Sequence, residues 1–197
     1  MEKMIIATKN KGKVQDFKEL FSKYGIEIKS LLDLEESIPD IEETGDSFAE
    51  NAAIKAETIS KMFSLPVLAD DSGIEVDALD GRPGIYSARY AGEEKNDQAN
   101  IAKLLNELST VPLDKRTARF VCVLAVARPG QSTIFKRGTC EGNIANEPHG
   151  NNGFGYDPVF YPKGSDKTMA QLSSQEKNTI SHRKNAIIQL EKWLKDN

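Results

Sequence analysis

The sequence predicts an α/β protein with a mixed β-sheet, and three observations lead to this fold class. First, an apolar run at residues 4–8 passes directly into a glycine-containing loop and an amphipathic helical pattern. Second, a capped helical segment at residues 47–63 leads into another apolar run at residue 67. Third, residues 119–127 form the strongest strand pattern, and a turn leads to a returning strand. The 197 residues suffice for one core, or for two lobes around one cleft.

The composition excludes several classes of function. A net charge of −4 gives no general attraction to nucleic acid or acidic membranes, so an anionic ligand requires a local cluster of lysine and arginine, or a metal. The N-terminal apolar run is too short for a signal peptide or a membrane span. Cys122 and Cys140 lack metal-ligand spacing and are interpreted as reduced core thiols. We therefore expect a cytoplasmic protein that binds neither nucleic acid nor membrane.

The N-terminal segment predicts a strand, a loop and a helix. The helix carries an apolar face and ends at Gly25 as a C-cap; the face consists of Val14, Phe17, Leu20, Phe21 and Tyr24. The loop at residues 9–13 can direct backbone N–H groups and a helix N-terminus at a phosphate, although it lacks the P-loop pattern. The alternative is a plain strand–helix turn with solvated lysines, and this segment alone does not exclude it.

Residues 26–30 are predicted as a second strand, residues 31–43 as an acidic loop, and residues 47–63 as a helix. Ser47 and Glu50 have the spacing of a capping box, and the buried face is expected to hold Phe48, Ala52, Ala56, Ile59 and Phe63. Lys55 falls near this face, so its side chain either extends out to solvent or meets an anion. Periodicity alone favours the first of these.

The segment at residues 67–73 carries two adjacent carboxylates. The apolar run Val67–Ala69 leads to Asp70 and Asp71 and then to Ser72–Gly73, where the chain can leave extended geometry. We expect a buried strand that ends in acid at the sheet edge, where open α/β folds bind ligands. The alternative is an ordinary acidic turn. Because successive strand residues point to opposite faces, the two acids should have different roles unless the chain turns between them.

The second half of the chain predicts one helix and an antiparallel pair of strands. Asn96 or Asp97 can cap a helix whose apolar stripe consists of Ile101, Leu104, Leu105 and Leu108. The strand at residues 119–127 should pair with residues 133–141 in antiparallel fashion, which makes the sheet mixed. A short strand is expected at residues 158–161.

A glycine-rich loop and the last helix supply further candidate ligand-binding residues. The loop at residues 150–157 interleaves three glycines with Phe154 and Tyr156. Phe154 could stack on a flat ring, or it could anchor the loop to the core. The last helix is expected from Ser181, and His182 and Arg183 in its first turn oppose the helix dipole, which suggests that they face a ligand.

Several separated segments of this chain resemble the inosine triphosphate pyrophosphatase family. The segments occur in the family's order over nearly the whole chain: residues 8–13, residues 43–45, Phe48-x-Glu50-Asn51, residues 70–92, residues 153–158, Lys177 and residues 181–183. One departure is Asn151-Asn152, where many relatives have Thr or Gly. The resemblance implies an α/β fold with a long mixed central sheet and flanking helices. It also implies one two-lobed domain over residues 1–197, with the lobes around an active-site cleft, and a homodimer.

The same resemblance implies an activity and assigns residues to it. Members hydrolyse ITP, dITP and XTP to the monophosphate and pyrophosphate, need Mg²⁺, and keep deaminated purines out of DNA and RNA. For the triphosphate, the residues implied by position are Thr8, Asn10, Lys13 and Lys55, and further substrate-binding residues implied by the resemblance are Lys9, Lys11, Gly12 and Ser72. Glu43 and Asp71 would bind Mg²⁺, and Asp71 would also be the base that positions water. For the purine, the residues are Phe154 as the stacking ring, Gly155, Tyr156 and Asp157 around it, and Lys177, His182 and Arg183 at the purine edge.

Two alternatives to this activity remain open. A pyrimidine triphosphate pyrophosphatase of similar architecture would differ only in base preference. A nucleotide-binding module without turnover is the other, although the combination of Lys13, Glu43 and Asp71 argues for catalysis. A haloacid dehalogenase-type enzyme would need an Asp-x-Asp motif, whereas the acids here are adjacent.

Overall fold

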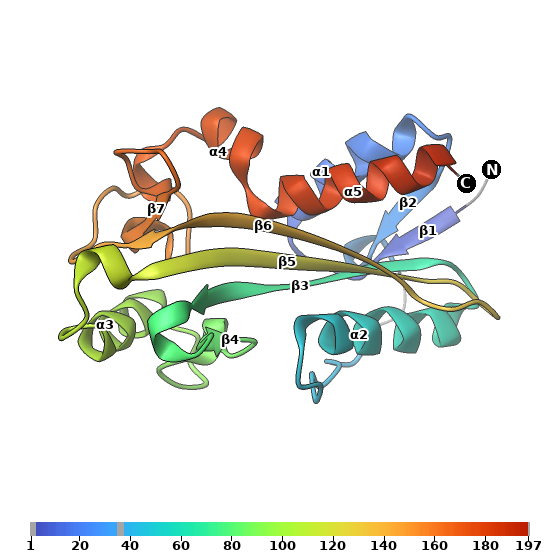
Figure 1. Ribbon diagram of the computed structural model, residues 1–197. Helices are drawn as coiled ribbons and strands as arrows, with labels where there is room; N and C mark the ends of the chain where they lie inside the picture. Colours follow the sequence, from blue (N-terminus) through green and yellow to red (C-terminus); the bar gives the residue numbers. More distant parts are fainter. Residues whose placement is uncertain (1–2, 35–37, 197) are drawn as a thin grey trace. The chain divides into compact units, whose positions relative to one another are not determined.

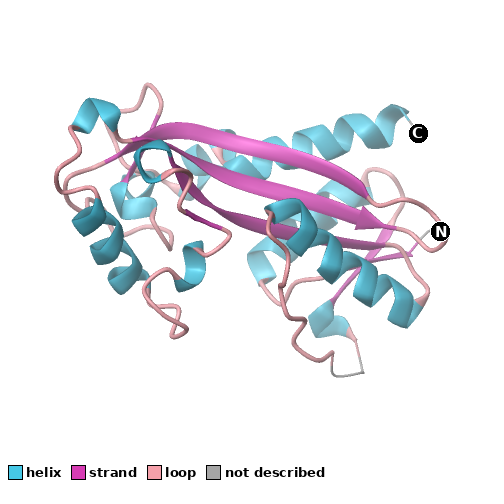
Figure 2. Ribbon diagram, turned by 60° about the horizontal axis from the view of Figure 1, so that its bottom comes forward, coloured by secondary structure: helices cyan, strands magenta, loops and turns pink. Residues whose placement is uncertain are grey.

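The computed structural model describes residues 3–34 and 38–196, and these fold as two compact units. Unit 1 contains the described residues up to Asp71, residues 123–137 and the chain from Ala186 onward. Unit 2 contains residues 72–122 and 138–185. The long strands β3 (Val67–Val76), β5 (Thr117–Ala127) and β6 (Ile134–Ile144) contribute residues to both units, and they are the longest magenta arrows in Figure 2.

The strands confirm the expected mixed α/β class. Within the described residues a seven-stranded sheet has the order β2-β1-β3-β5-β6-β7, and β4 pairs with β3 off this path. Strand β1 (Lys3–Ile6) is parallel to β2 (Glu27–Ser30) and to β3. Strand β4 (Pro83–Gly84) is antiparallel to β3, and β7 (Phe160–Pro162) is antiparallel to β6.

Unit 1 carries helices on both faces of its strands. In Figure 1, α1 (Lys11–Ser22) and the unit 1 part of α5 (His182–Asp196) lie on one side, and α2 (Phe48–Phe63) lies on the other. Ala52 and Ala56 of α2 are fully buried and belong to a core cluster with Val67 and Ala69 of β3. Small side chains let the helix approach the sheet closely, so α2 is held directly beside the strand that carries both aspartates.

The start of α2 differs slightly from the predicted capping box. Ser47 is the N-cap, and its Oγ accepts the N–H of Glu50 at 3.2 Å. The Glu50 carboxylate accepts the N–H of Asp46 at 2.6 Å, one residue before the cap. The predicted acidic loop at residues 31–43 begins with a 3₁₀ turn at Leu31–Asp33, and residues 35–37 lie outside the described residues.

The strand with the two aspartates does not end where the sequence predicts. We expected the chain to leave extended geometry at Ser72–Gly73, but β3 continues to Val76. Ile74 and Val76 are fully buried in unit 2, and Ile74 pairs with Gly84 of β4. The buried apolar side chains therefore outweigh the turn tendency of Ser-Gly, and the expected strand end is wrong.

Unit 2 is organised around its own core. The buried cluster joins α3 (Asp97–Glu107) to strand and loop segments through residues such as Leu104, Phe120 and Phe160. Asn96 rather than Asp97 caps α3, because its side chain accepts the N–H of Ala99. The last strand begins two residues later than expected, and α4 (Ser174–Ile180) follows it. Among the described residues no helix combines the length and apolar character needed to span a membrane.

Candidate active site

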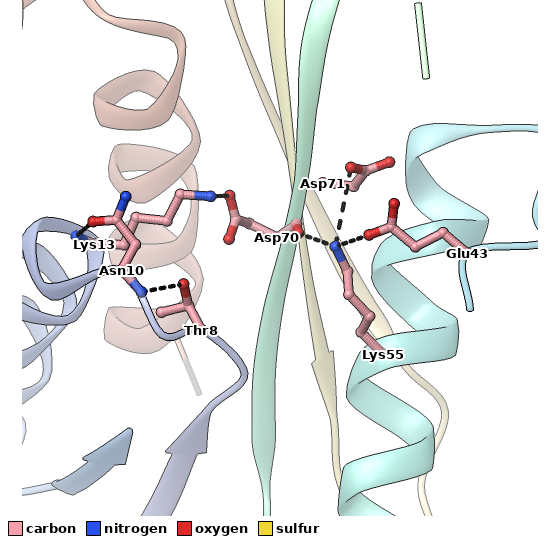
Figure 3. Close-up of polar contacts among 7 residues, drawn as sticks. All are labelled: Thr8, Asn10, Lys13, Glu43, Lys55, Asp70 and Asp71. Atoms are coloured by element: carbon pink, nitrogen blue, oxygen red, sulfur yellow. Dashed lines mark hydrogen bonds and ion pairs between the residues drawn. The ribbon is translucent and has the colours of Figure 1, made fainter. Parts of the chain in front are cut away.

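Unit 1 brings the N-terminal loop to the β3 aspartates because β1 and β3 are parallel. Ile6 pairs with Leu68, so the chain leaves β1 beside the segment that leads to Asp70. Thr8 Oγ1 accepts the N–H of Asn10 at 3.1 Å, and Asn10 Oδ1 accepts the N–H of Lys13 at 3.1 Å. These two bonds fold residues 8–13 into a compact turn at the start of α1 (Figure 3). The N–H groups of Asn10 and Lys13 are thus bonded within the turn, and phosphate binding by this segment stays a prediction.

Lys13 forms a tight ion pair with Asp70. Its Nζ donates to Asp70 Oδ2 at 2.6 Å, and the Asp70 side chain is only 5% exposed. The other predicted residues of the segment lie further outward: Lys9 and Lys11 are exposed, and Lys9 Nζ lies 4.0 Å from Asp40. Gly12 is part of the first turn of α1 rather than of the loop. Of the lysines in this segment, Lys13 is therefore the one fixed against the sheet.

Lys55 joins a second group of acids. Its Nζ donates to Glu43 Oε1 at 2.5 Å and to the carbonyl oxygen of Asp70 at 2.7 Å, and it lies 4.0 Å from Asp71 Oδ1. The interpretation that periodicity favours, a lysine extending out to solvent, is wrong here. The side chain is instead 19% exposed, because the Glu43 loop and β3 offer it three oxygen partners.

The two aspartates point to opposite faces of β3, as the strand geometry predicts. Figure 3 shows Asp70 directed to Lys13 and Asp71 directed to the side of Lys55 and Glu43. Ala69 packs in the α2 core cluster, and Asp71, two residues later, shares its face. The chain does not turn between the acids, so each keeps a separate partner. Asp70 anchors a lysine, whereas Asp71 belongs to the group with Glu43.

The two carboxylates beside Lys55, those of Glu43 and Asp71, are suitable ligands for a magnesium ion. Glu43 and Asp71 present hard carboxylate oxygens that share one ammonium as their neighbour. Among the described residues no group of three or more His, Cys, Asp or Glu side chains is arranged to hold a metal. Mg²⁺ is commonly held by one or two carboxylates together with phosphate oxygens and water, so two carboxylates satisfy its protein share.

Unit 2 holds the predicted base-binding residues, and Phe154 is its most exposed large apolar side chain. Phe154 is 66% exposed, so the alternative that it anchors the loop to the core is wrong. The flanking Gly153 and Gly155 have φ of +84° and +59°, a region that favours glycine. At Gly153 a side chain would also collide with the Asp157 carboxylate and the Lys177 ammonium. The loop geometry therefore requires glycine on both sides of the exposed ring.

The acid and hydroxyl beside Phe154 hold its loop in place. Asp157 is 7% exposed, and its Oδ2 accepts Lys177 Nζ at 2.5 Å and the N–H of Phe154 at 3.2 Å. The Tyr156 hydroxyl donates to the carbonyl of Ser87 at 2.6 Å, and burial raises the pKa of this phenol. Lys177 has three N–H donors, so its bond to Asp157 leaves donors for another acceptor.

His182 and Arg183 begin α5 as predicted. The imidazole of His182 stacks on Phe120 with ring centroids 5.1 Å apart. This packing explains why the imidazole lies where it does. Arg183 Nε is buried and has no acceptor within residues 3–34 and 38–196. Ser72 lies in β3 directly after Asp71. The roles of these three residues toward a ligand stay predictions.

The structure adds two residues that the sequence analysis did not assign to the site. Asp97 accepts the N–H of Gly155 at 2.7 Å and so ties the Phe154 loop to α3. Asn51 accepts the N–H of Gly45 at 2.8 Å, two residues after Glu43. Neither contact can be predicted from the spacing of residues in the sequence, because each partner is a backbone N–H group of an irregular loop. The only signal in the sequence was the place of Asn51 within the segment that resembles the family.

Comparison with known proteins matches nearly the whole chain. The model of the Ham1 family matches residues 4–193. A protein of Oceanobacillus iheyensis named dITP/XTP pyrophosphatase is 64% identical over 194 residues, which are 98% of this chain and 98% of that protein. A protein of the same name from Halalkalibacterium halodurans is 60% identical over 98% of this chain and 100% of its own length.

Solved structures also match nearly the whole chain. The Ham1 protein of Staphylococcus aureus has a TM-score of 0.92 and 49% identity, with 99% of both chains covered. A nucleoside-triphosphatase / dITP/XTP pyrophosphatase from Mycobacterium abscessus has a TM-score of 0.83 and 41% identity over 95% of this chain and 98% of its own. The similarity therefore extends over sequence and fold together.

Proposed function

This chain belongs to the Ham1 family, and we propose that it is a Mg²⁺-dependent pyrophosphatase of non-standard purine nucleoside triphosphates. It converts ITP, dITP and XTP to the monophosphate and pyrophosphate. The observation that carries the proposal is the placement of Asp71 and Glu43 around Lys55, on the opposite face of β3 from the Asp70–Lys13 pair. In this proposal Asp71 and Glu43 serve water and metal on one face of the strand, and Asp70 fixes Lys13 on the other. The names of the similar proteins supply the substrate class.

Glu43 and Asp71 are the residues that would hold the Mg²⁺ ion. When bound, Mg²⁺ neutralises phosphate charge and lowers the pKa of water in its coordination sphere. Two lysines complement it from the protein side: Lys13, fixed by Asp70, and Lys55, fixed by Glu43. They supply local positive charge in a chain whose net charge is −4, where no general attraction for a triphosphate exists.

Asp71 acts as the base in this mechanism. It takes a proton from the attacking water as the water oxygen forms a bond to the α phosphorus. The bond from that phosphorus to the oxygen bridging the α and β phosphates breaks, and pyrophosphate leaves. Residues 8–13 and Lys55 hold the phosphates, which keeps the α phosphorus within reach of the water. The carboxylate of Asp71 lies on the α2 side of β3 and that of Asp70 on the other, so Asp70 does not compete for the same proton.

Unit 2 selects the base. Phe154 presents an exposed ring for stacking, and Gly155, Tyr156 and Asp157 shape the surroundings of that ring. Lys177 and Arg183 can only donate hydrogen bonds, which suits the six-position carbonyl of hypoxanthine and xanthine. Adenine presents an amino donor there and would leave buried donors unsatisfied, a loss of about 1–3 kcal/mol.

The cellular role we propose is removal of deaminated purines from the nucleotide pool before they enter DNA or RNA. The thiols of Cys122 and Cys140 are buried and form no disulfide, which fits a reducing compartment, so we assign the protein to the cytoplasm. The family resemblance supports a homodimer, which sedimentation would test. The substrate is the only nucleotide partner we propose, since the net charge does not favour nucleic acid.

Phosphorus NMR of the protein with Mg²⁺ and parallel samples of ITP, XTP, GTP, ATP and dTTP tests the proposal. Pyrophosphate from ITP and XTP, with GTP and ATP nearly untouched, is the expected result. Orthophosphate would place the attack at the γ phosphate and contradict the mechanism. Fast cleavage of dTTP would favour the pyrimidine enzyme, and nucleotide binding without turnover would favour the binding module.

A further inference from the structure

The loop that carries Glu43 is tied to the first turns of α2 by three hydrogen bonds. Asn51 Oδ1 accepts the N–H of Gly45 at 2.8 Å, and Glu50 Oε2 accepts the N–H of Asp46 at 2.6 Å. Ser47 caps the helix by accepting the N–H of Glu50. The chain between Glu43 and the helix therefore has little freedom, although it is not regular secondary structure.

The contact between Asn51 and Gly45 is close enough to exclude any side chain at position 45. A Cβ on Gly45 would lie 2.6 Å from Glu50 Cβ and 2.8 Å from Asn51 Oδ1. Real Cβ atoms do not approach other atoms so closely, so the loop can pack here only with glycine. The φ of Gly45 is not in the left-handed region, so this glycine is needed for close approach rather than for backbone freedom.

Asn51 is buried although, in the part of the chain that the structure describes, only one of its two polar side-chain atoms has a partner. It is fully buried, and its Nδ2 has no acceptor within the described ranges 3–34 and 38–196. A buried donor without an acceptor destabilises the folded state, so Asn51 is held at this position by what its Oδ1 does. The Oδ1 bond to Gly45 is the one polar contact of its side chain recorded within those ranges.

Asn51 also lies one helical turn before Lys55, on the same face of α2. Lys55 holds the Glu43 carboxylate directly at 2.5 Å, and Asn51 holds the backbone two residues further along the loop. Glu43 is thus fixed at both its side chain and its loop by residues four apart on one helix.

We propose that Asn51 is a positioning residue for Glu43, and that it sets the affinity of the site for a divalent cation. This inference rests on the proposed function, in which Glu43 and Asp71 hold Mg²⁺. Asn51 does not touch substrate or metal. It fixes the loop so that the Glu43 carboxylate is held on the α2 side of β3, where Asp71 points.

The test measures cation binding directly on Asn51→Leu and Gly45→Ala. The probe is Mn²⁺, followed by electron paramagnetic resonance in the presence of an ITP analogue whose α–β bridging oxygen is replaced by methylene. Groups that support metal ligands contribute about 10–100-fold to metal affinity, and we expect a loss in this range for Asn51→Leu. At saturating Mg²⁺ the KM for ITP should stay near that of the unchanged protein.

Asn100→Leu is the matched control. Asn100 is also a buried helical asparagine that bridges a loop, since it accepts the N–H of Ala91 at 2.7 Å and donates to Ala88 at 3.0 Å. It belongs to α3 in unit 2 and holds no loop of unit 1. It should lose thermal stability while its Mn²⁺ affinity stays unchanged, which separates a positioning effect from general destabilisation.

The outcomes distinguish the inference from the proposed function. Weaker Mn²⁺ binding in Asn51→Leu, reproduced by Gly45→Ala and not further weakened in the double variant, supports the positioning role. Normal Mn²⁺ binding in a folded Asn51→Leu or Gly45→Ala protein overturns it. If Asn51→Leu does not fold, Gly45→Ala alone gives the decision. If the unchanged protein binds no Mn²⁺, the proposed metal function itself is wrong.

Discussion

At the scale of single residues, the adjacent acids Asp70 and Asp71 show how a strand divides two identical side chains between two roles. Lys13 lies 2.6 Å from Asp70, whereas Asp71 lies with Glu43 around Lys55. The division needs no special chemistry, because alternate residues of β3 face α1 and α2. Exchange of either acid for its amide should therefore give different defects.

Asp71→Asn should remove turnover while nucleotide binding survives. An amide cannot accept the proton of water, and loss of a general base lowers kcat by about 10²–10⁴-fold. Calorimetry with the methylene analogue of ITP would show binding, and phosphorus NMR would show the lost pyrophosphate. Asp70→Asn is the neighbouring control, and we expect its defect to appear in KM because Lys13 loses its partner. A near-normal kcat in Asp71→Asn would remove Asp71 from its role.

Phe154→Ala should raise KM for ITP and leave kcat nearly unchanged. Stacking of a base on an aromatic ring contributes about 1–3 kcal/mol, and it acts on ground and transition states alike. Because the ring is 66% exposed, the variant should keep its thermal stability. Phe154→Trp retains a stacking surface and serves as control. Steady-state kinetics decides, and an unchanged KM in Phe154→Ala would show that the ring does not stack on the base.

At the scale of elements, the first turn of α3 supports the loop that presents Phe154. Asp97 follows the N-cap Asn96, and its carboxylate accepts the N–H of Gly155 at 2.7 Å. A second bond, from the N–H of Phe154 to Asp157, fixes the loop from within. The exposed ring is therefore held by the backbone on both sides, which reduces the entropy lost when a base stacks on it.

Asp97→Ala should raise KM for ITP by roughly three- to tenfold, as expected for about 1 kcal/mol from one hydrogen bond. The change should leave kcat unchanged, because Asp97 holds the loop of Phe154 and takes no part in the proton transfer that we assign to Asp71. Asp97→Asn keeps an acceptor oxygen and should restore most of the affinity, although it removes the charge. Equal KM values for the alanine variant and the unchanged protein would show that the loop holds its shape without this bond.

At the scale of the whole molecule, burial changes the ionisation of the Cys140 thiol, which lies in the core of unit 2. Burial raises the pKa of Cys140 to about 11 from its usual value of 9.0, and Glu141 and Asp157 act in the same direction. Between these two pH values the folded state keeps a proton that the unfolded state releases. The contribution to stability is therefore complete below pH 9 and is lost as the pH rises toward 11.

The free energy of unfolding should accordingly fall more steeply above pH 9 in the unchanged protein than in Cys140→Ala. Urea denaturation between pH 8 and about 10 measures the slope. Tyr90, whose pKa burial raises from 10.0 to about 12, begins to contribute near the upper end of this window, but it is present in both proteins and its contribution cancels in the comparison. The comparison uses slopes, so the smaller core side chain of the variant does not affect it. Parallel slopes would show that the thiol does not titrate differently in the folded state.

Much of this molecule could be predicted from local pattern. The α2 segment, the α3 stripe and the β5 strand follow from caps and periodicity, which depend on neighbouring residues only. The end of β3 could not be predicted, because burial of Ile74 and Val76 outweighs the local tendency of Ser72–Gly73. The same limit applies to Lys55, whose partners on the Glu43 loop and β3 are 12 and 15 residues away.

The sequence by itself determined the fold class, the family resemblance and the set of candidate residues, because residue types and their order carry that information. Only the tertiary structure decided which acid meets which lysine, since this depends on the face of β3 that each side chain occupies. It also decided that Phe154 is exposed and that Asn51 and Asp97 accept the backbone N–H groups of Gly45 and Gly155. A hydrogen bond between a side chain and the backbone N–H of a loop produces no periodic pattern in the sequence, so it can be identified only in the folded structure.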